Sequence, residues 1–459
     1  MIGMLDFNTS KPLYEQLYEN IAQAIQAGTF KQGQKMLGKR TLAEQLGISV
    51  NTVDTAYQML VAEGYLESRP RSGFYVMEVE QLTEVSSAIP QEESVCKTQW
   101  NFDFSTGAID QSLFPFRTWG RIQKELLYSK PQLLSMGDGQ GDLELREALA
   151  QHLQRYRGVT CSANQIVIGA GIEYLLGLLM PLLGETIALE DPGYPKAKQV
   201  IENANSKWIA VPVDKNGLSV EELSKTNAQA VYVTPSHQFP TAVTMPVGRR
   251  SALLAWAAAD PARFIIEDDY DSEFRFDIRP LPSLQGMSKS GKVIYISTFS
   301  KSLAPSIRIA CMVLPHTLIK PWKQRYGGYA STVSRFEQQT LCEFIQQGFL
   351  SRHLSRLRNC YRKRMERFKT AVQQCLGNSV KIYGQHTGLH FLIEFETASE
   401  QQLLQAAYQH GLKVSGLKQY CSTESKGKTA VVLVGYGCLA EEQIMPAAKA
   451  LQQAWNEYL

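Results

Sequence analysis

Residues 292–310, KVIYISTFSKSLAPSIRIA, join an apolar run to a polar turn that holds one lysine between two serines. The run at 292–297 predicts a short buried strand, because its apolar residues are bounded by turn-forming ones. Lys301 follows that strand, and Arg308 lies seven residues further on. A lysine in such a turn is usually an ordinary solvated side chain, so its meaning depends on the rest of the chain.

Four similar apolar runs precede this one and are separated from each other by longer helical patterns. The runs lie at 165–169, 186–190, 230–235 and 263–268, and the helical patterns include 171–183 and 249–259. This alternation predicts an α/β domain with a largely parallel central sheet. From about residue 347, long charged helices and two further strands at 388–396 and 429–437 predict a smaller α+β lobe.

Three of the predicted strand ends carry residues with a chemical use. Ligand sites in α/β folds gather beyond the carboxyl ends of the strands. Asp268 and Tyr270 follow one strand, Ser300, Lys301 and Arg308 follow another, and Gly169, Ala170 and Gly171 open a helix after a third. A buried carboxylate can keep a pyridine nitrogen protonated, a lysine can condense with an aldehyde, and a glycine-rich helix start can bind phosphate. Together these features indicate pyridoxal 5′-phosphate as the cofactor.

The N-terminal part predicts three helices and a hairpin. The first helix is expected at 11–27, from apolar residues at intervals of four. The second is expected to have Thr41 as its N-cap, in a capping box with Glu44, and to end at Gly47. Ser49 is expected to cap the third, and the segment after it reads as two short strands around the turn RPRSG. This order of elements is that of a winged helix-turn-helix.

The polar side chains of this part favour DNA binding over a purely structural role. Residues at the start and on the outer face of the third helix are placed to reach bases or phosphates, and basic residues flank it on both sides. The DNA-binding candidates are Ser49, Asn51, Thr52 and Thr55 on the helix, with Lys39, Arg40, Arg69 and Arg71 around it.

Composition sets limits on the class of protein. With 459 residues the chain is expected to contain two or three domains: 1–78, a flexible linker at 79–99, and 100–459. The net charge of +3 is too small to indicate a nucleic acid or a membrane by itself. No signal segment or long apolar run is present, which predicts a cytoplasmic protein without a membrane partner. The eight cysteines form no C-x-x-C pair, so no metal site is expected.

Residues 11–77 resemble a GntR-type winged helix. The pattern R-x-LA-x-x-LG-x-S-x-NTV-x-x-AY-x-x-L-x-x-EG-Y-L begins at Arg40 and is followed by a wing that ends at Val76. Val50 stands where this family usually has an arginine, so the operator preference of other members does not carry over.

The region from about 100 to 455 resembles a fold-type I aminotransferase. The matching segments are GDGQGDLELREAL at 137–149, DPGYP at 191–195, TPSHQFPT at 234–241 and FSKSLAPSIRIA at 299–310. The resemblance implies that Lys301 carries the cofactor, Asp268 faces the pyridine nitrogen and Tyr270 donates to the ring 3-oxygen. It also implies phosphate contacts from Ser300, Arg308 and the amides of Gly169 to Gly171. A winged helix joined to such a domain resembles the MocR subfamily of GntR regulators, especially its GabR-like members.

This resemblance implies a DNA-binding transcriptional regulator that senses an amino-group-containing effector by forming an external aldimine. It also implies a homodimer that reads two half-sites in a double-stranded operator. Tyr194, Lys196 and Lys418 match positions near the effector in GabR-like proteins. Two alternatives remain: a regulator that senses pyridoxal 5′-phosphate to control vitamin B6 synthesis, and an active aminotransferase.

Several departures from the aminotransferase pattern bear on turnover. The strand at 429–437 has no arginine to bind a substrate carboxylate, and Lys196 and Lys418 offer no planar fork. Met136 replaces a tyrosine that often helps to hold phosphate, and Phe239 replaces an asparagine that contacts the ring. We expect at most weak transaminase activity, while cofactor binding survives.

Overall fold

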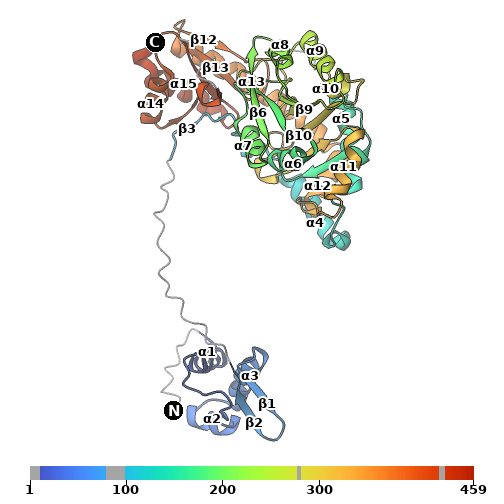
Figure 1. Ribbon diagram of the computed structural model, residues 1–459. Helices are drawn as coiled ribbons and strands as arrows, with labels where there is room; N and C mark the ends of the chain where they lie inside the picture. Colours follow the sequence, from blue (N-terminus) through green and yellow to red (C-terminus); the bar gives the residue numbers. More distant parts are fainter. Residues whose placement is uncertain (1–10, 79–98, 277–280, 423–428) are drawn as a thin grey trace. The chain divides into compact units, whose positions relative to one another are not determined.

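The computed structural model describes residues 11–78, 99–276, 281–422 and 429–459 (Figure 1). The chain divides into two compact units, Met1–Lys97 and Thr98–Leu459. The predicted linker at 79–99 lies outside the described residues except for its last position. Within the described ranges, no helix is both long enough and apolar enough to cross a membrane.

The first unit is a winged helix, as predicted. Its elements are α1 (Leu13–Gln26), α2 (Lys39–Leu46), α3 (Val50–Ala62) and the antiparallel hairpin of β1 (Leu66–Arg69) and β2 (Gly73–Val76). The apolar stripe of α1 packs against α3, and Leu17, Val53 and Tyr57 are fully buried between the helices. This small core holds α3 with its polar face exposed.

The ends of these helices show one wrong prediction and two correct ones. The capping box of Thr41 and Glu44 does not form, because the N-cap of α2 lies three residues earlier, at Gly38. The Gly38 carbonyl accepts the first helical hydrogen bond, from the Leu42 N–H at 2.9 Å. Gly47 ends the helix at φ 64°, where a side chain would be strained. Ser49 caps α3 by accepting from the Thr52 N–H at 3.0 Å.

The second unit contains an eight-stranded mixed sheet in the order β4-β11-β10-β9-β8-β5-β6-β7. The five adjacent strands from β10 to β6 run parallel, and β11 and β7 are antiparallel to their neighbours. This confirms the largely parallel sheet. The strands are β4 (Ile166–Gly169), β5 (Thr186–Asp191), β6 (Lys207–Asp214), β7 (Gly217–Leu218), β8 (Ala230–Val233), β9 (Phe264–Asp269), β10 (Val293–Thr298) and β11 (Ala310–Val313).

Helices cover both faces of this sheet. Ile166 and Ile168 of β4 pack into one core with α5 and α12, whereas Val167 between them packs into another core with α6 and α11. This division follows from the alternation of side chains along a strand. The helices of this region are α4 (Phe116–Ser129), α5 (Leu143–Arg157), α6 (Ile172–Leu179), α7 (Pro195–Asn203), α8 (Val220–Ser224), α9 (Val247–Ala258), α10 (Leu284–Met287), α11 (His316–Tyr326) and α12 (Arg335–Gln346).

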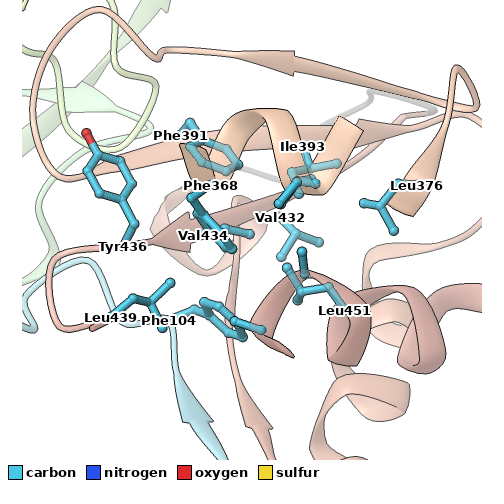
Figure 2. Packing of buried hydrophobic residues seen from close by; sticks show 14 of the residues in the cluster. Phe104, Phe368, Leu376, Phe391, Ile393, Val432, Val434, Tyr436, Leu439 and Leu451 are labelled. Carbon is cyan, nitrogen blue, oxygen red and sulfur yellow. The ribbon is translucent and has the colours of Figure 1, made fainter. Parts of the chain in front are cut away.

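The predicted small α+β lobe is present as well. The long helix α13 (Phe349–Leu376) leads into an antiparallel sheet in the order β12-β13-β16-β15. Figure 2 shows Phe368 of α13, Phe391 of β13 and Val434 of β16 meeting in one apolar core. The other elements are β12 (Val380–Tyr383), β13 (His390–Phe395), α14 (Glu400–Gln409), β14 (Leu412–Lys413), β15 (Ser415–Gly416), β16 (Ala430–Gly435) and α15 (Ile444–Trp455), while β3 (Phe102–Asp103) pairs with β14.

Short 3₁₀ helices connect several of these elements. They are η1 (Gln111–Leu113), η2 (Pro131–Leu134), η3 (Ala163–Gln165), η4 (Met180–Leu182), η5 (Pro305–Ile307), η6 (Lys418–Tyr420), η7 (Glu441–Gln443) and η8 (Asn456–Tyr458). Of these, η5 and η6 matter for function because η5 follows Lys301 and η6 contains Lys418.

Candidate cofactor pocket and nucleic-acid interface

A pocket of about 260 Å³ lies beyond the carboxyl ends of β8, β9 and β10, beside the start of α6. This is where an α/β sheet places its ligand. The pocket is lined by Thr106, Gly107, Ile172, Glu173, Tyr194, Lys196, Thr234, Phe239, Asp268, Tyr270, Thr298, Ser300, Lys301, Pro305 and Arg308. The strand-end residues Asp268, Tyr270, Ser300, Lys301 and Arg308 are therefore brought together as expected.

Asp268 lies buried at the base of this pocket with half of its hydrogen-bonding capacity unused. Its Oδ2 accepts from the Tyr232 hydroxyl, whereas its buried Oδ1 has no partner. Burial raises the pKa of Asp268 to about 7, with smaller contributions from the neighbouring acids Asp269 and Asp271 and against the lowering effect of the Tyr232 hydrogen bond. A buried carboxyl group in this state would be stabilised by a cationic N–H donor.

Lys301 lies on the same side of the sheet, next to a second acid. Its side chain is 12% exposed, and its Nζ is 3.5 Å from Asp271 Oδ2 and 4.7 Å from the centre of the Tyr270 ring. The Nδ1 of His237 lies 2.8 Å from the same Asp271 oxygen and 3.0 Å from the Tyr270 hydroxyl. Burial opposes ionisation of Asp271, but His237 and Lys301 outweigh it and hold the pKa of Asp271 below its ordinary value. Lys301 thus has a carboxylate partner within ion-pair distance.

Arg308 and the start of α6 form the opposite end of the pocket. The Arg308 guanidinium donates to the Ala170 carbonyl at 3.0 Å and to Glu173 Oε2 at 2.9 Å. A Cβ on Gly171, whose φ is 97°, would lie 2.2 Å from Arg308 Nη2, so only glycine fits this close approach. The glycine-rich turn therefore fixes the position of the Arg308 guanidinium through close packing and a hydrogen bond.

The predicted phosphate contacts from the amides of Gly169 to Gly171 stay a prediction, and two of these amides have acceptors within the chain. The Ala170 N–H donates to the Thr332 hydroxyl at 3.1 Å, and the Gly171 N–H donates to the Gly169 carbonyl at 2.9 Å. The glycine-rich turn does not line the pocket, whereas Ile172 and Glu173 at the start of α6 do. Arg308 and Ser300 remain as the phosphate-binding candidates that line the pocket.

Glu173 was not singled out in the sequence, although it shapes the charge of the pocket. It forms ion pairs with Arg308 at 2.9 Å and with Lys196 at 3.0 Å. Burial opposes its ionisation, but Lys196 and Arg308 lower the pKa of Glu173 to about 2. Two cations share one carboxylate here, which leaves one positive charge for an anionic ligand group.

The effector candidates are only partly brought together. Tyr194 and Lys196 line the pocket, and the Lys196 side chain is 60% exposed. Lys418 is exposed on η6 and does not line it, because the Glu400 carboxylate binds its N–H at 3.0 Å and fixes the turn. Tyr420, two residues later, reaches the pocket wall through its ring contact with Phe239 at 5.0 Å.

These side chains fit pyridoxal 5′-phosphate. The unpartnered Asp268 Oδ1 can accept from the ring nitrogen, Lys301 can reach the aldehyde, and Arg308 can bind the phosphate. Sequence reasoning missed Tyr232, His237 and Asp271, which orient these groups. His237 and Asp271 lie inside the segments TPSHQFPT and EDDYD, but only folding brings the two segments together.

The candidate DNA-reading residues of the first unit lie along α3. Asn51 and Thr55 are exposed, and the Thr55 hydroxyl donates to the Asn51 carbonyl at 2.9 Å. The hydroxyl groups of Ser49 and Thr52 lie 2.8 Å apart at the N-terminus of the helix. Asn51 therefore has the most available polar side chain on this face.

Of the basic candidates around α3, two form ion pairs within the first unit and two do not, among the described residues. Lys39 pairs with Asp54, and Arg69 pairs with Glu67 at 2.8 Å and stacks over the Tyr75 ring. Arg40 and Arg71 are exposed, and neither has an ion pair among the described residues. Arg71 lies in the wing turn at φ 61°. These two arginines are the most available phosphate ligands.

Comparison with known proteins agrees with both units. The model of the family "Aminotransferase class I and II" matches residues 101–431, and that of "Bacterial regulatory proteins, gntR family" matches residues 13–76. The crystal structure of Pyrococcus horikoshii kynurenine aminotransferase has a TM-score of 0.70 at 24% identity, over 78% of this chain and 91% of that one. That likeness shows the fold of the second unit.

Full-length relatives are transcriptional regulators. The HTH-type transcriptional regulator YdeL of Bacillus subtilis is 39% identical over 97% of both chains. The probable rhizopine catabolism regulatory protein MocR of Rhizobium meliloti is 32% identical over 98% of this chain and 95% of its own. The pyridoxine biosynthesis regulator PdxR of Corynebacterium glutamicum is 30% identical over 94% and 93%. The chain therefore belongs to the MocR-type regulators of the gntR family, in which a winged helix precedes an aminotransferase-like domain that binds pyridoxal 5′-phosphate.

Proposed function

We propose that this regulator changes its DNA binding when a small compound with a primary amino group enters the pocket around Lys301. The observation that carries the proposal is the set of Lys301, Asp268 and Arg308 in one pocket of a chain that also has a winged helix. The relatives named for rhizopine catabolism and for pyridoxine biosynthesis point to different small molecules, so the effector is identified here by its amine chemistry.

The proposed sensing step depends on a charge change at Lys301. When bound, pyridoxal 5′-phosphate supplies an aldehyde that can react with a primary amine. An effector amine competes with Lys301 for that aldehyde, and Lys301 Nζ regains its positive charge when it is displaced. Asp271, 3.5 Å away, stabilises that charge.

The small lobe packs directly against the residues around Lys301, so a change of charge at Lys301 can affect the position of that lobe. A Cβ on Gly388 would lie 2.0 Å from His237, and the rings of His237 and His390 are 4.9 Å apart. His237 in turn contacts Asp271. We propose that the effector acts by its different affinity for two arrangements of the lobes, as any such ligand must.

Net transamination is expected to be slow, because the pocket offers no free arginine fork for a substrate carboxylate. The lining arginine, Arg308, and the lining lysine, Lys196, both pair with Glu173. A carboxylate that is held loosely leaves the reacting Cα–H bond poorly aligned, and misplacement by about 1 Å can cost on the order of a hundredfold in rate. We therefore propose a regulator with little turnover.

We also propose that the protein acts as a homodimer. Large apolar side chains of α4, η2 and the following loop are exposed to an unusual degree: Tyr128 82%, Leu134 81%, Met136 83% and Phe116 65%. Contiguous exposed apolar side chains usually mark an interface, and these four belong to consecutive segments of the chain. A second copy of the chain is the occupant that fits a reader of two half-sites.

Changes in the winged helix are expected to separate DNA affinity from DNA specificity. Arg71→Ala should weaken binding to a site selected from random DNA and to unrelated DNA alike, and should reduce the salt slope by about one. Asn51→Ala should lower discrimination at one base position by about tenfold. Fluorescence anisotropy at several salt concentrations measures both. Lys11→Ala, which removes a lysine already paired with Glu19, should change neither; unchanged affinity in an Arg40, Arg69 and Arg71 triple alanine variant would refute the interface.

Light scattering is expected to give twice the chain mass of 51.4 kDa. Replacing Tyr128 and Leu134 together by glutamate should yield monomers, because charged groups cannot be buried in an apolar interface without partners. Tyr408→Glu, at a side chain of the small lobe that is 60% exposed, is the matched control and should leave the dimer intact. A monomer of the unmodified protein at micromolar concentration would contradict the proposal.

Asp268→Asn is expected to lower the affinity for the cofactor and also to reduce the pH dependence of the free energy of unfolding. The pKa of Asp268 is about 7 in the fold, above its ordinary 3.8, so the unfolded chain ionises at lower pH than the folded one. The cofactor-free fold therefore loses stability as pH rises from about 4 to about 7. The free energy of unfolding of the variant should therefore fall less between about pH 4 and pH 7 than that of the unmodified protein, by on the order of 1–3 kcal/mol. It should also bind pyridoxal 5′-phosphate more weakly, because the ring nitrogen loses an anionic partner.

The matched control for Asp268→Asn is Glu190→Gln. Burial likewise raises the pKa of Glu190 to about 7, but its side chain does not line the pocket. Glu190→Gln should share the effect on pH dependence and keep the cofactor affinity. Urea denaturation and cofactor titration measure the two properties; equal cofactor affinity in Asp268→Asn and the unmodified protein would show that Asp268 does not face the ring nitrogen.

Lys301→Ala is expected to abolish the response to effector. Primary amines would be screened for a change in the visible absorption of the bound cofactor, and the hits tested for a change in DNA affinity. Lys323→Ala, at an exposed lysine of α11, should respond like the unmodified protein. Several turnovers per minute with a keto-acid acceptor would favour an enzyme, and a full DNA response to pyridoxal 5′-phosphate without any amine would favour a cofactor sensor.

A further inference from the structure

We propose that a second cavity, on the opposite face of the central sheet from the cofactor pocket, binds a small oxyanion through arginine side chains. The cavity has a volume of about 360 Å³ and lies between α5, the end of β10, the segment after β9 and the start of α13. Its charged lining comprises Arg155, Arg157, Arg275, Arg358 and Glu273. None of these residues has a part in the function proposed above.

The position of this cavity follows from the alternation of side chains along one strand. Ser297 of β10 and Phe299 after it line the arginine cavity, whereas Thr298 between them and Ser300 line the cofactor pocket. Successive residues of an extended chain point to opposite faces. The same carboxyl edge of the sheet therefore serves two cavities, one on each face.

Two arginines in the wall of the cavity have no acidic partner among the described residues, and one of them has a buried N–H group without an acceptor. Arg275 is 6% exposed; its Nη2 donates to the Ser236 carbonyl at 2.9 Å, but its buried Nε has no partner. Arg358 donates from Nε to the Glu273 carbonyl oxygen at 3.0 Å. In the described part of the chain, neither guanidinium has an ion pair, and nor does Arg155 at the rim. A buried guanidinium N–H without an acceptor is costly unless a ligand supplies one.

The other ionisable groups of the cavity do not neutralise the positive charge of Arg155, Arg275 and Arg358. Arg157 is neutralised by Asp269, with Nε 2.6 Å from Oδ2. Burial lowers the pKa of His152 to about 4, so this cavity-lining residue is neutral near pH 7. Glu273 is the opposing acid, and burial raises its pKa to about 7. Three unpaired guanidinium groups thus face a single carboxyl group that is only partly ionised at neutral pH.

The chemistry of the lining indicates the class of ligand. Guanidinium groups present planar forks of N–H donors that match phosphate and carboxylate oxygens. The cavity is large enough for a small metabolite, and four arginines in its lining favour an anionic one. A phosphate group or a dicarboxylate supplies the acceptors that Arg275 and Arg358 lack.

The test uses the full-length protein with its cofactor bound, so that the phosphate-binding end of the first pocket is already occupied. Equilibrium dialysis would measure binding of inorganic phosphate and, separately, of succinate, which distinguishes a phosphate from a carboxylate ligand. We expect one saturable site per chain for at least one probe. Arg358→Gln should weaken it by about tenfold or more, and Glu273→Gln should tighten it, because the first removes a donor and the second removes a negative charge.

Two further variants keep the test decisive. Arg362→Gln changes an exposed arginine one turn along α13 that does not line the cavity, and it should bind the probe like the unmodified protein. Arg155→Gln removes an exposed rim arginine and should weaken binding even if Arg358→Gln fails to fold. Absence of saturable binding of either probe up to about 10 mM, a Kd limit that corresponds to very weak affinity, would overturn the proposal. Equal affinity in Arg155→Gln, Arg358→Gln and Arg362→Gln would overturn it as well.

Discussion

Four acidic residues at the end of β9 impose the strongest constraint on the second unit. Glu267, Asp268, Asp269 and Asp271 are all almost completely buried. An unpaired charge in a protein interior is far too costly to persist, so each carboxyl group requires its own partners or must stay neutral. The surrounding elements are arranged so that these partners arrive from different directions.

The partners of these four acids come from segments far apart in the chain. The backbone N–H groups of Leu284 and Gln285 at the start of α10 donate to Glu267, and Arg157 at the end of α5 pairs with Asp269. Asp271 meets His237 and Lys301, while one oxygen of Asp268 remains open toward the pocket. Asp268 Oδ1 and Asp271 Oδ1 both lack a partner among the described residues. Of these two acids, Asp268 lines the cofactor pocket, where a ligand can complete its hydrogen bonding.

The two faces of the sheet carry related chemistry around the same acids. Asp268 faces the cofactor pocket, whereas Asp269, next in the strand, pairs with Arg157 on the face of the arginine cavity. The small lobe reaches the first pocket through Gly388 and His390, and α13, which leads into that lobe, supplies Arg358 to the second cavity. Both cavities therefore border elements that join the large and small lobes, where a bound ligand can influence lobe arrangement.

Local pattern was enough to establish the type and order of most elements. The apolar runs that end at Gly169 and Ser297, the amphipathic stripe of α1 and the cap at Ser49 depend on neighbours within a few residues, and such patterns are set by the chain itself. The grouping of Asp268, Lys301 and Arg308 was also predictable, because the carboxyl ends of parallel strands share one edge.

Only the tertiary structure decided which groups remain available to a ligand. Three features each depend on a hydrogen bond to another residue of the chain: the N-cap of α2 at Gly38 instead of Thr41, the acceptors of the Ala170 and Gly171 amides, and the placement of Lys418 outside the pocket. The pairing of Glu173 with both Arg308 and Lys196, and of His237 with Asp271, joins residues between 23 and 135 positions apart. Sequence by itself determines which chemical groups exist, whereas burial and long-range contacts determine which of them are already satisfied, because that depends on partners brought together only by folding.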